Sequence, residues 1–237
     1  MAVKIEEEEM ASRDSSEDKE QVHGGIPRIN IFKAKHCISG SNADQQAKQL
    51  GETGGSGERR RTQNRNPIDP IQAQQNFNVQ QFAGVWRLFA VASKCSHLST
   101  NNHRLEAVIV KVSDQTEAMR VNTLRKLDGI CWDIKQEYKK AAIPGRFSRK
   151  NRGLTTDIVI SETDYTNYAI VFFQQRRKIT LKLYGRTTNI NEAVQRKFRQ
   201  LVLNNNIPDI LIYKFPDYGF CETADEFHQL DDDVGTI

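Results

Sequence analysis

From residue 76 onward, short runs rich in β-branched and aromatic residues are separated by turn residues at a spacing of roughly 8–12 positions. This spacing is typical of an all-β domain. Eight strands are predicted, at residues 85–92, 105–112, 118–124, 132–138, 146–148, 157–161, 168–173 and 179–184. Antiparallel strands of this number and length can close into an up-and-down barrel, which removes unpaired edges and encloses room for one small ligand.

One segment after these strands has a helical period instead. Within residues 191–205 the apolar positions recur at helical spacing, at Ala193, Val194, Phe198, Leu201 and Val202. Asn189 or Asn191 can cap the start of a helix, and Pro208 forbids its continuation. We therefore predict one amphipathic C-terminal helix, and residues 210–213 can add a ninth strand.

The first 66 residues show neither period. They are rich in Glu, Ser, Gly, Gln and Arg, which predicts a disordered N-terminal tail over residues 1–66 and a barrel domain over residues 67–237. The run Asp231-Asp232-Asp233 is interpreted as a solvated tail.

Charge and hydropathy exclude two classes of function. The net charge of +4 is thinly spread, and the basic run Arg59-Arg60-Arg61 lies among Gly, Ser, Thr and Asn. A nucleic-acid binder would concentrate its basic residues on one face and place aromatic residues between them. Membrane insertion is not expected either, because no apolar stretch approaches the ~20 residues of a span.

Three separated motifs occur in order along the predicted barrel. They are Gly84-x-Trp86 at the first strand, Thr163-Asp164-Tyr165 between the sixth and seventh strands, and Arg186 after the eighth strand. With eight strands between them and a helix after them, the chain resembles the lipocalin family. The resemblance implies that Trp86 plugs the closed end of a cup-shaped barrel, with Arg186 across its ring.

The mouth of such a barrel is the expected binding site, for a small lipophilic ligand or an apolar segment of a partner. The predicted lining residues are Leu88, Ala90, Val121, Ile160, Val171, Phe173 and Leu183. An error of one residue in strand parity would invert the list for that strand.

Within the family, the chain is most similar to the lipocalins that serve as complement subunits. Residues 82–84, 125–132, 162–165 and 218–228 carry this match, which runs from about residue 66 to about residue 232. It implies a secreted, non-enzymatic subunit that is bound to the alpha chain of the eighth complement component and carried into the membrane attack complex. The alternative is a free carrier or scavenger lipocalin, although the absence of any Asn-x-Ser/Thr sequence mildly disfavours that usually glycosylated class.

The four cysteines have no C-x-x-C spacing, so a zinc site is not predicted. The resemblance implies an intrachain disulfide between Cys131 and Cys221, and an interchain disulfide from Cys95 to the alpha chain. A thiol at Cys95 that is free or paired with Cys37 is the alternative, and Cys37 is assigned no role.

Disulfides require an oxidising compartment, yet Met1 leads into Glu6-Glu7-Glu8-Glu9 where a signal peptide needs a basic region and an apolar run. We interpret residues 1–65 as a mispredicted start or an alternative first exon. The alternative is a cytosolic lipocalin with reduced thiols.

No catalytic, cofactor or metal site is predicted. Cys95 and His97 are neighbours in sequence, but a nucleophilic pair also needs an orienting third group. His103 and His228 are scattered along the chain, which favours surface or core positions over metal ligation.

Overall fold

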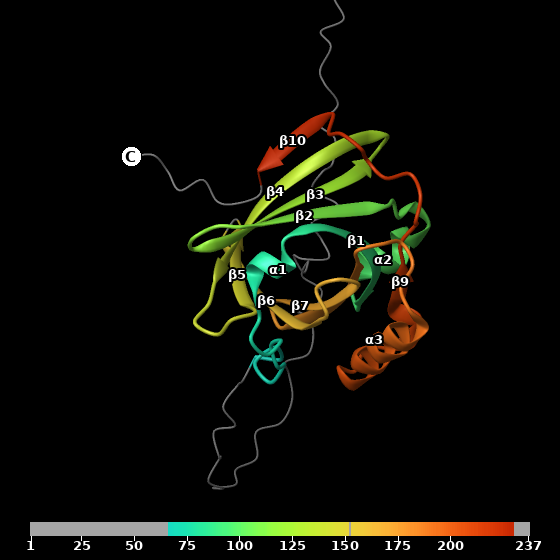
Figure 1. The fold of residues 1–237 in the computed structure, drawn as a ribbon. Coiled ribbons are helices and arrows are strands. Elements are labelled where there is room, and N and C mark those ends of the chain that lie inside the picture. The colour runs from blue at the N-terminus through green and yellow to red at the C-terminus, as the bar shows by residue number, and fades with distance from the viewer. Residues whose placement is uncertain (1–65, 152, 230–237) are drawn as a thin grey trace, which may run out of the picture. The chain divides into compact units, whose positions relative to one another are not determined.

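The computed structural model describes residues 66–229 except residue 152 (Figure 1). Cys37, Asp231-Asp232-Asp233 and all but the last residue of the predicted tail lie outside the described residues. The tail, the domain boundary and the acidic C-terminal run therefore stay predictions.

Eight antiparallel strands form a closed barrel, which confirms the predicted fold. They are β1 (Gly84–Ser93), β2 (Val108–Asp114), β3 (Ala118–Leu127), β4 (Ile130–Lys140), β5 (Arg146–Asn151), β6 (Leu154–Thr163), β7 (Tyr168–Gln175) and β8 (Lys178–Gly185). Each strand pairs with its neighbour in sequence, and β1 pairs with β8. This last pairing closes the sheet on itself, so the barrel has no free edge.

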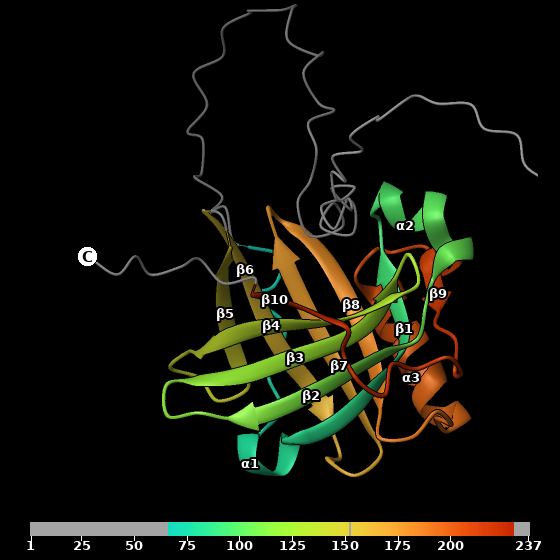
Figure 2. The same cartoon turned by 90° about the horizontal axis from the view of Figure 1, so that it is seen from above.

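Short helices mark the two ends of β1. Helix α1 (Val79–Phe82) precedes it, while α2 (Ser96–Asn101) and the 3-10 helix η2 (Asn102–Arg104) follow it. Figure 2 shows α1 and α2 at opposite ends of this strand. The α1 end is the closed end of the barrel, and the α2 end, where β1 leads into β2, is called the mouth below.

The predicted C-terminal helix is α3 (Glu192–Asn204), and it packs on the outside of the barrel. The side chain of Asn191 caps it by accepting a hydrogen bond from the Ala193 amide at 2.7 Å. Phe198 and Val202 are buried in an apolar cluster with Leu181 and Leu183 of β8. The covering helix therefore buries the outer face of β8 from solvent, as the barrel interior buries its inner face.

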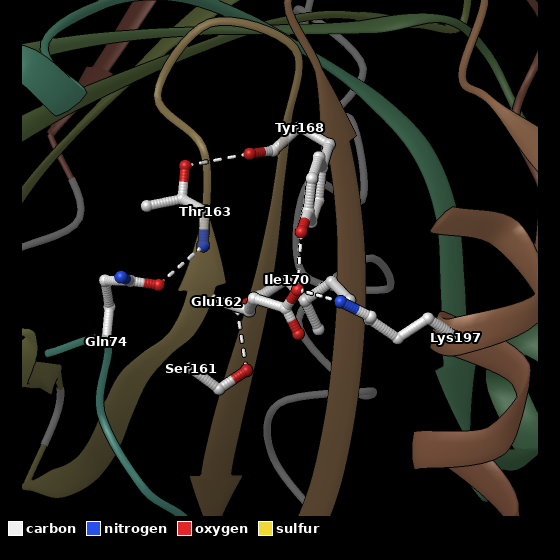
Figure 3. A network of polar contacts seen from close by, with 7 residues as sticks. All are labelled: Gln74, Ser161, Glu162, Thr163, Tyr168, Ile170 and Lys197. Carbon is white, nitrogen blue, oxygen red and sulfur yellow. Dashed lines mark hydrogen bonds and ion pairs between the residues drawn. The ribbon is translucent and has the colours of Figure 1, made fainter. Parts of the chain in front are cut away.

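A polar network joins α3 to the barrel wall (Figure 3). Glu162 of β6 accepts hydrogen bonds from the Tyr168 hydroxyl and from the ammonium of Lys197 on α3. Burial and the Glu162 carboxylate raise the pKa of Tyr168 well above its ordinary value, which keeps this hydroxyl protonated as a donor. Beside it, the hydroxyl of Thr163 donates to the Tyr168 carbonyl at 2.8 Å, and its amide donates to Gln74 at 3.0 Å.

Two additional strands lie outside the barrel circuit. After the 3-10 helix η3 (Asp209–Leu211), β9 (Ile212–Lys214) pairs with β1, close to the predicted ninth strand. The sequence reasoning missed β10 (Glu226–Gln229), which runs parallel to β4 (Figure 1). Among the described residues, no helix is long and apolar enough to cross a membrane.

Candidate functional site: the barrel interior and its closed end

The closed end is built around Trp86, whose side chain is only 1% exposed. Its ring stacks on Phe82 with the centroids 5.0 Å apart, and its indole nitrogen donates to the Phe82 carbonyl at 2.8 Å. The guanidinium carbon of Arg186 lies 3.7 Å from the centre of the tryptophan ring. Trp86 thus combines apolar burial with a satisfied indole donor and a cation over its face.

Arg186 also connects the two loops that carry the other motifs. Its guanidinium donates to the carbonyls of Ala83 at 2.9 Å and Val85 at 3.1 Å, and its Nε donates to the Tyr165 carbonyl at 2.9 Å. Gly84 allows this approach, because it has φ of +104° and a side chain there would begin 3.0 Å from the Arg186 guanidinium. The three motifs therefore meet at one side chain.

Asp164 organises the turn between β6 and β7. Its carboxylate accepts hydrogen bonds from the backbone amides of Thr166, Asn167 and Tyr168, at 3.2, 2.8 and 3.0 Å. Burial alone would raise the pKa of Asp164, but these hydrogen bonds outweigh it and lower the pKa. The turn that presents the Tyr165 carbonyl to Arg186 is consequently held by a charged acceptor.

Above the closed end, an apolar cavity occupies the barrel interior. The space open to the centre of a water-sized molecule is about 30 Å³, and the cavity is partly open to solvent. Its walls are formed by Phe82, Trp86, Val110, Val112, Met119, Val121, Tyr138, Ile158, Ile160, Val171, Phe173 and Tyr184. Burial, with a smaller contribution from Tyr138, raises the pKa of Tyr184 well above its ordinary value, so the Tyr184 hydroxyl stays neutral. An uncharged, mainly aliphatic and aromatic wall suits an apolar molecule.

Four of the seven predicted lining residues, Val121, Ile160, Val171 and Phe173, line this cavity. Leu88 packs in the interior cluster but does not line the cavity. The prediction was wrong for Ala90 and Leu183, which belong to the outer cluster under α3.

A β-bulge and a covering helix explain the two errors. The bulge lies between Leu88 and Ala90, so Leu88 and Val91 both face inward while Ala90 faces outward. In β8 the apolar Leu183 faces α3, and the inward positions are Lys182 and Tyr184. The more apolar face of this strand is therefore the outer one.

Sequence reasoning also missed a group of basic side chains near the mouth. Arg125 of β3, Arg149 of β5 and Lys182 of β8 occupy inward positions of three separate strands. Arg149 is 5% exposed, and the Lys182 ammonium lies 4.5 Å from the centre of the Phe173 ring. Burial, together with the charges of Arg149 and Arg125, lowers the pKa of Lys182 to about 8. These residues, called the mouth cations below, give the upper interior a chemistry different from that of the cavity.

The cysteines within the described part of the chain, Cys95, Cys131 and Cys221, are disulfide-bonded. Cys131 and Cys221 form a disulfide with a Cα separation of 5.7 Å, in the pairing that the family resemblance implied. Asp225 reinforces it, because its carboxylate accepts from the Cys131 amide at 2.8 Å and its own amide donates to the Cys131 carbonyl at 2.7 Å. Together these contacts hold the C-terminal segment along β4.

Cys95 lies at the N-cap of α2 in the mouth and is half-buried. It is disulfide-bonded and so presents no thiolate nucleophile to a substrate. The described residues do not test whether Cys95 bonds a partner chain, and Cys37, the alternative partner, lies outside them. Over the same residues, no group of His, Cys, Asp and Glu side chains is arranged to hold a metal ion.

A closed eight-stranded antiparallel barrel with a plugged end, an interior cavity and a helix on its outer wall defines a lipocalin. In agreement, the model of the lipocalin and cytosolic fatty-acid binding protein family matches residues 83–217, and the chain belongs to this family. It is 43% identical over 167 residues to the complement component C8 gamma chain of Oryctolagus cuniculus, across 70% of this chain and 83% of that protein. This match confirms the resemblance to complement-subunit lipocalins.

Two further relatives extend the comparison. Protein AMBP of Rattus norvegicus is 30% identical over 167 residues, which cover 67% of this chain and 48% of AMBP, so this chain spans about half the length of that relative. The solved structure of the siderocalin Ex-FABP superposes with a TM-score of 0.53 at 19% identity, covering 59% of this chain and 96% of that one. The structural match shows a shared fold.

Proposed function

We propose that this chain is a secreted, non-enzymatic lipocalin subunit of the eighth complement component. In this proposal it associates with the alpha chain and is carried with it into the membrane attack complex, without inserting into the membrane itself. The observation that carries the proposal is the 43% identity to a C8 gamma chain over 167 residues. The disulfide-anchored C-terminal segment supports it, because residues 218–228 carry part of the same resemblance.

The contact surface in this proposal is the barrel mouth. Helix α2 begins directly after Cys95, and its Leu98 packs partly buried against the interior cluster. A partner chain at this end would therefore meet both Cys95 and the entrance to the cavity. We propose that in the assembled complex Cys95 is disulfide-bonded to the alpha chain: a cysteine thiolate of that chain attacks the disulfide of Cys95, and the present partner of Cys95 leaves as a thiol. We also propose that the cavity takes a small lipophilic ligand or an apolar segment of the partner.

Co-expression tests this assignment. The full chain and an affinity-tagged alpha chain of the same species would be produced in secretory cells, and the tagged chain purified. We expect the two chains to co-purify, to migrate as one band on a non-reducing denaturing gel, and to separate on reduction. Cys95→Ala should separate them without reductant, whereas the neighbouring Ser96→Ala should not.

Two outcomes would contradict different parts of the proposal. Failure of the two wild-type chains to co-purify would overturn the subunit assignment. A peptide that links Cys95 to Cys37, or a Cys95 that can be alkylated in the purified complex, would overturn only the covalent bond.

The second candidate function is a free carrier or scavenger resembling alpha-one-microglobulin. The 30% identity to AMBP favours it, together with the run from Lys182 to Arg186, which resembles the corresponding stretch of that lipocalin. In this case the chain would be secreted alone, and the co-expressed alpha chain would not retain it.

A further inference from the structure

The turn between β7 and β8 holds two arginines in a backbone conformation that disfavours them. Gln175 pairs with Lys178, so the turn consists of Arg176 and Arg177 alone. Both have positive φ, +46° and +63°. A two-residue turn of this kind favours Asn-Gly, and a residue other than glycine in the left-handed conformation costs about 1–2 kcal/mol. The chain therefore keeps two exposed guanidinium groups where Asn-Gly would be more stable, as residues held for function often are.

Exposed lysines extend this positive charge along the mouth. Lys178 follows the turn directly, and Lys94 lies one position beyond the last pair of β1 with β8, next to the start of β8. On the other side, the pairings of β5, β6 and β7 place Lys150 level with the turn. Figure 2 shows the β5–β6 and β7–β8 hairpins ending on the same side of the barrel as α2. The five exposed residues Lys94, Lys150, Arg176, Arg177 and Lys178 are called the basic rim below.

The basic rim occupies one side of a mouth whose other side carries exposed acidic residues. The sequence has no Asp or Glu between residues 165 and 191, so the charged side chains of β7, the turn and β8 are all basic. Across the mouth, the β3–β4 turn and the C-terminal segment expose Asp128, Glu222, Asp225 and Glu226. The rim also differs from the mouth cations, which point into the barrel, because its side chains lie in solvent.

The length of the basic rim indicates the shape of its partner. Its charges are spread from β5 across β6, β7 and β8 to β1. At about 4.8 Å between neighbouring strands, these four steps cover roughly 20 Å. A compact anion would contact only part of this row, whereas an extended polyanion can follow all of it.

The chemistry of the basic rim favours a sulfated polymer over a membrane or a nucleic acid. None of the exposed large apolar side chains in the described part of the chain belongs to the rim hairpins, so the rim has no apolar group to insert into a lipid surface and no aromatic ring to stack on bases. These exposed side chains are Val85, Ile143, Leu203, Ile210, Tyr218 and Phe227. A guanidinium pairs with two oxygens of a tetrahedral or planar anion at once, and an ammonium contacts such a group as a point charge.

We infer that the basic rim binds a linear sulfated polysaccharide of the glycosaminoglycan class. Arg176 and Arg177 donate charge-assisted hydrogen bonds to its sulfate groups, and the three lysines contact sulfates or carboxylates on either side. Binding releases counterions from the polymer, so the affinity falls as the salt concentration rises. This site lies on the outside of the mouth and goes beyond the proposed function, because it needs neither the cavity nor the alpha chain.

Immobilised heparin tests the inference on the full-length, disulfide-bonded chain. We expect the chain to be retained at about 0.15 M salt and released as the salt concentration is raised. Heparin from which the sulfate groups have been removed is the control polymer, and it should not retain the chain. Surface plasmon resonance at several salt concentrations would give the affinity and its salt dependence.

A double variant locates the site without endangering the fold. Arg176→Asn combined with Arg177→Gly removes two charges and installs the residues that the turn favours, so its thermal midpoint should not fall below that of the wild type. Its affinity for heparin should drop by about tenfold or more, with a shallower salt dependence. Lys111→Gln combined with Lys139→Gln removes the same net charge from exposed positions on β2 and β4, and it should stay within about twofold of the wild type.

Four results would overturn the inference. They are a wild-type chain that heparin does not retain at about 0.15 M salt, equal retention by the desulfated polymer, equal losses in the two double variants, and a turn that is needed for binding vesicles of phosphatidylcholine and phosphatidylserine but not for binding heparin. Because the isolated chain is used, these results leave the alpha-chain assignment intact, and a failure of co-purification leaves heparin binding standing.

Discussion

The guanidinium carbon of Arg186 lies over the ring of Trp86, 3.7 Å from the ring centre, although the whole circuit of the barrel separates the two residues along the chain. The same guanidinium donates to carbonyls before and within β1, and its Nε donates to the turn between β6 and β7. The closed end is consequently held by one side chain that joins three distant segments. Loss of either side chain should therefore lower the stability of the whole barrel.

Trp86→Ala should lower the free energy of unfolding by about 3–5 kcal/mol, the range for deletion of a fully buried large aromatic side chain. The cation over the ring and the indole hydrogen bond would be lost with it. Urea unfolding followed by circular dichroism would measure the change. A loss below about 1 kcal/mol would show that the tryptophan does not support the closed end in solution.

Gly84→Ala should destabilise the barrel more than Gly129→Ala. Both glycines have positive φ, +104° and +85°, so both variants carry a backbone cost of about 1–2 kcal/mol. Only at position 84 does the added carbon meet another group, the Arg186 guanidinium at 3.0 Å. Equal thermal shifts for the two variants would mean that Arg186 moves aside without loss.

Lys182→Met should stabilise the chain near neutral pH, and the gain should shrink as the pH rises. The pKa of Lys182 is lowered from 10.5 to about 8 by burial and by the charges of Arg149 and Arg125. Below pH 8 the Lys182 side chain is protonated in both the folded and the unfolded chain, so folding carries the full free-energy cost of burying its positive charge. Between pH 8 and 10.5 only the unfolded chain retains it, so the stability of the wild-type protein rises with pH.

The size of this effect follows from the same two pKa values. At about 1.4 kcal/mol per pH unit, the difference between 10.5 and about 8 makes the penalty about 3 kcal/mol at pH 7, before the lost contact with Phe173 is deducted. Urea unfolding at several pH values would compare the wild type, Lys182→Met and the exposed control Lys178→Met. Parallel stability profiles for wild type and Lys182→Met would contradict the burial of a positive charge in the mouth.

Breaking the disulfide with Cys221→Ser should release the C-terminal segment and weaken the domain. A bridge that closes a 90-residue separation stabilises by up to about 4–5 kcal/mol in the chain-entropy model, and often by less. Hydrogen exchange should become faster in residues 226–229 and in the β4 amides that pair with them, while the β6–β7 pairing stays protected. Unchanged exchange in β10 would show that the hydrogen bonds of Asp225 suffice to hold it.

A chain that begins at residue 66 should fold as the full chain does. Both apolar clusters and the pairing of β1 with β8 are formed by residues beyond this point. We expect the thermal midpoint to change by no more than a few degrees. A loss of cooperative unfolding would move the predicted domain boundary toward the N-terminus.

The sequence by itself determined the elements and their class. Alternating apolar positions, turn residues and three motifs were enough to predict eight strands, one helix and a lipocalin barrel, because these signals are local and the motifs are in the family's order. The pairing of Cys131 with Cys221 was available from the family resemblance as well. Helix α2 and strand β10 were missed, because neither has a period long enough to stand out.

Only the tertiary structure decided which face of each strand is the inside. A period of two distinguishes the faces of a strand but does not say which one meets the interior, and the bulge before Ala90 changes the parity within β1. On β8 the helix α3 makes the outer face apolar, so Leu183 faces α3 while Lys182 faces inward. Strand pairing and register decide which residues that are far apart in sequence lie close together in the barrel. Only the closed barrel therefore brings together the positive charges of Arg125, Arg149 and Lys182.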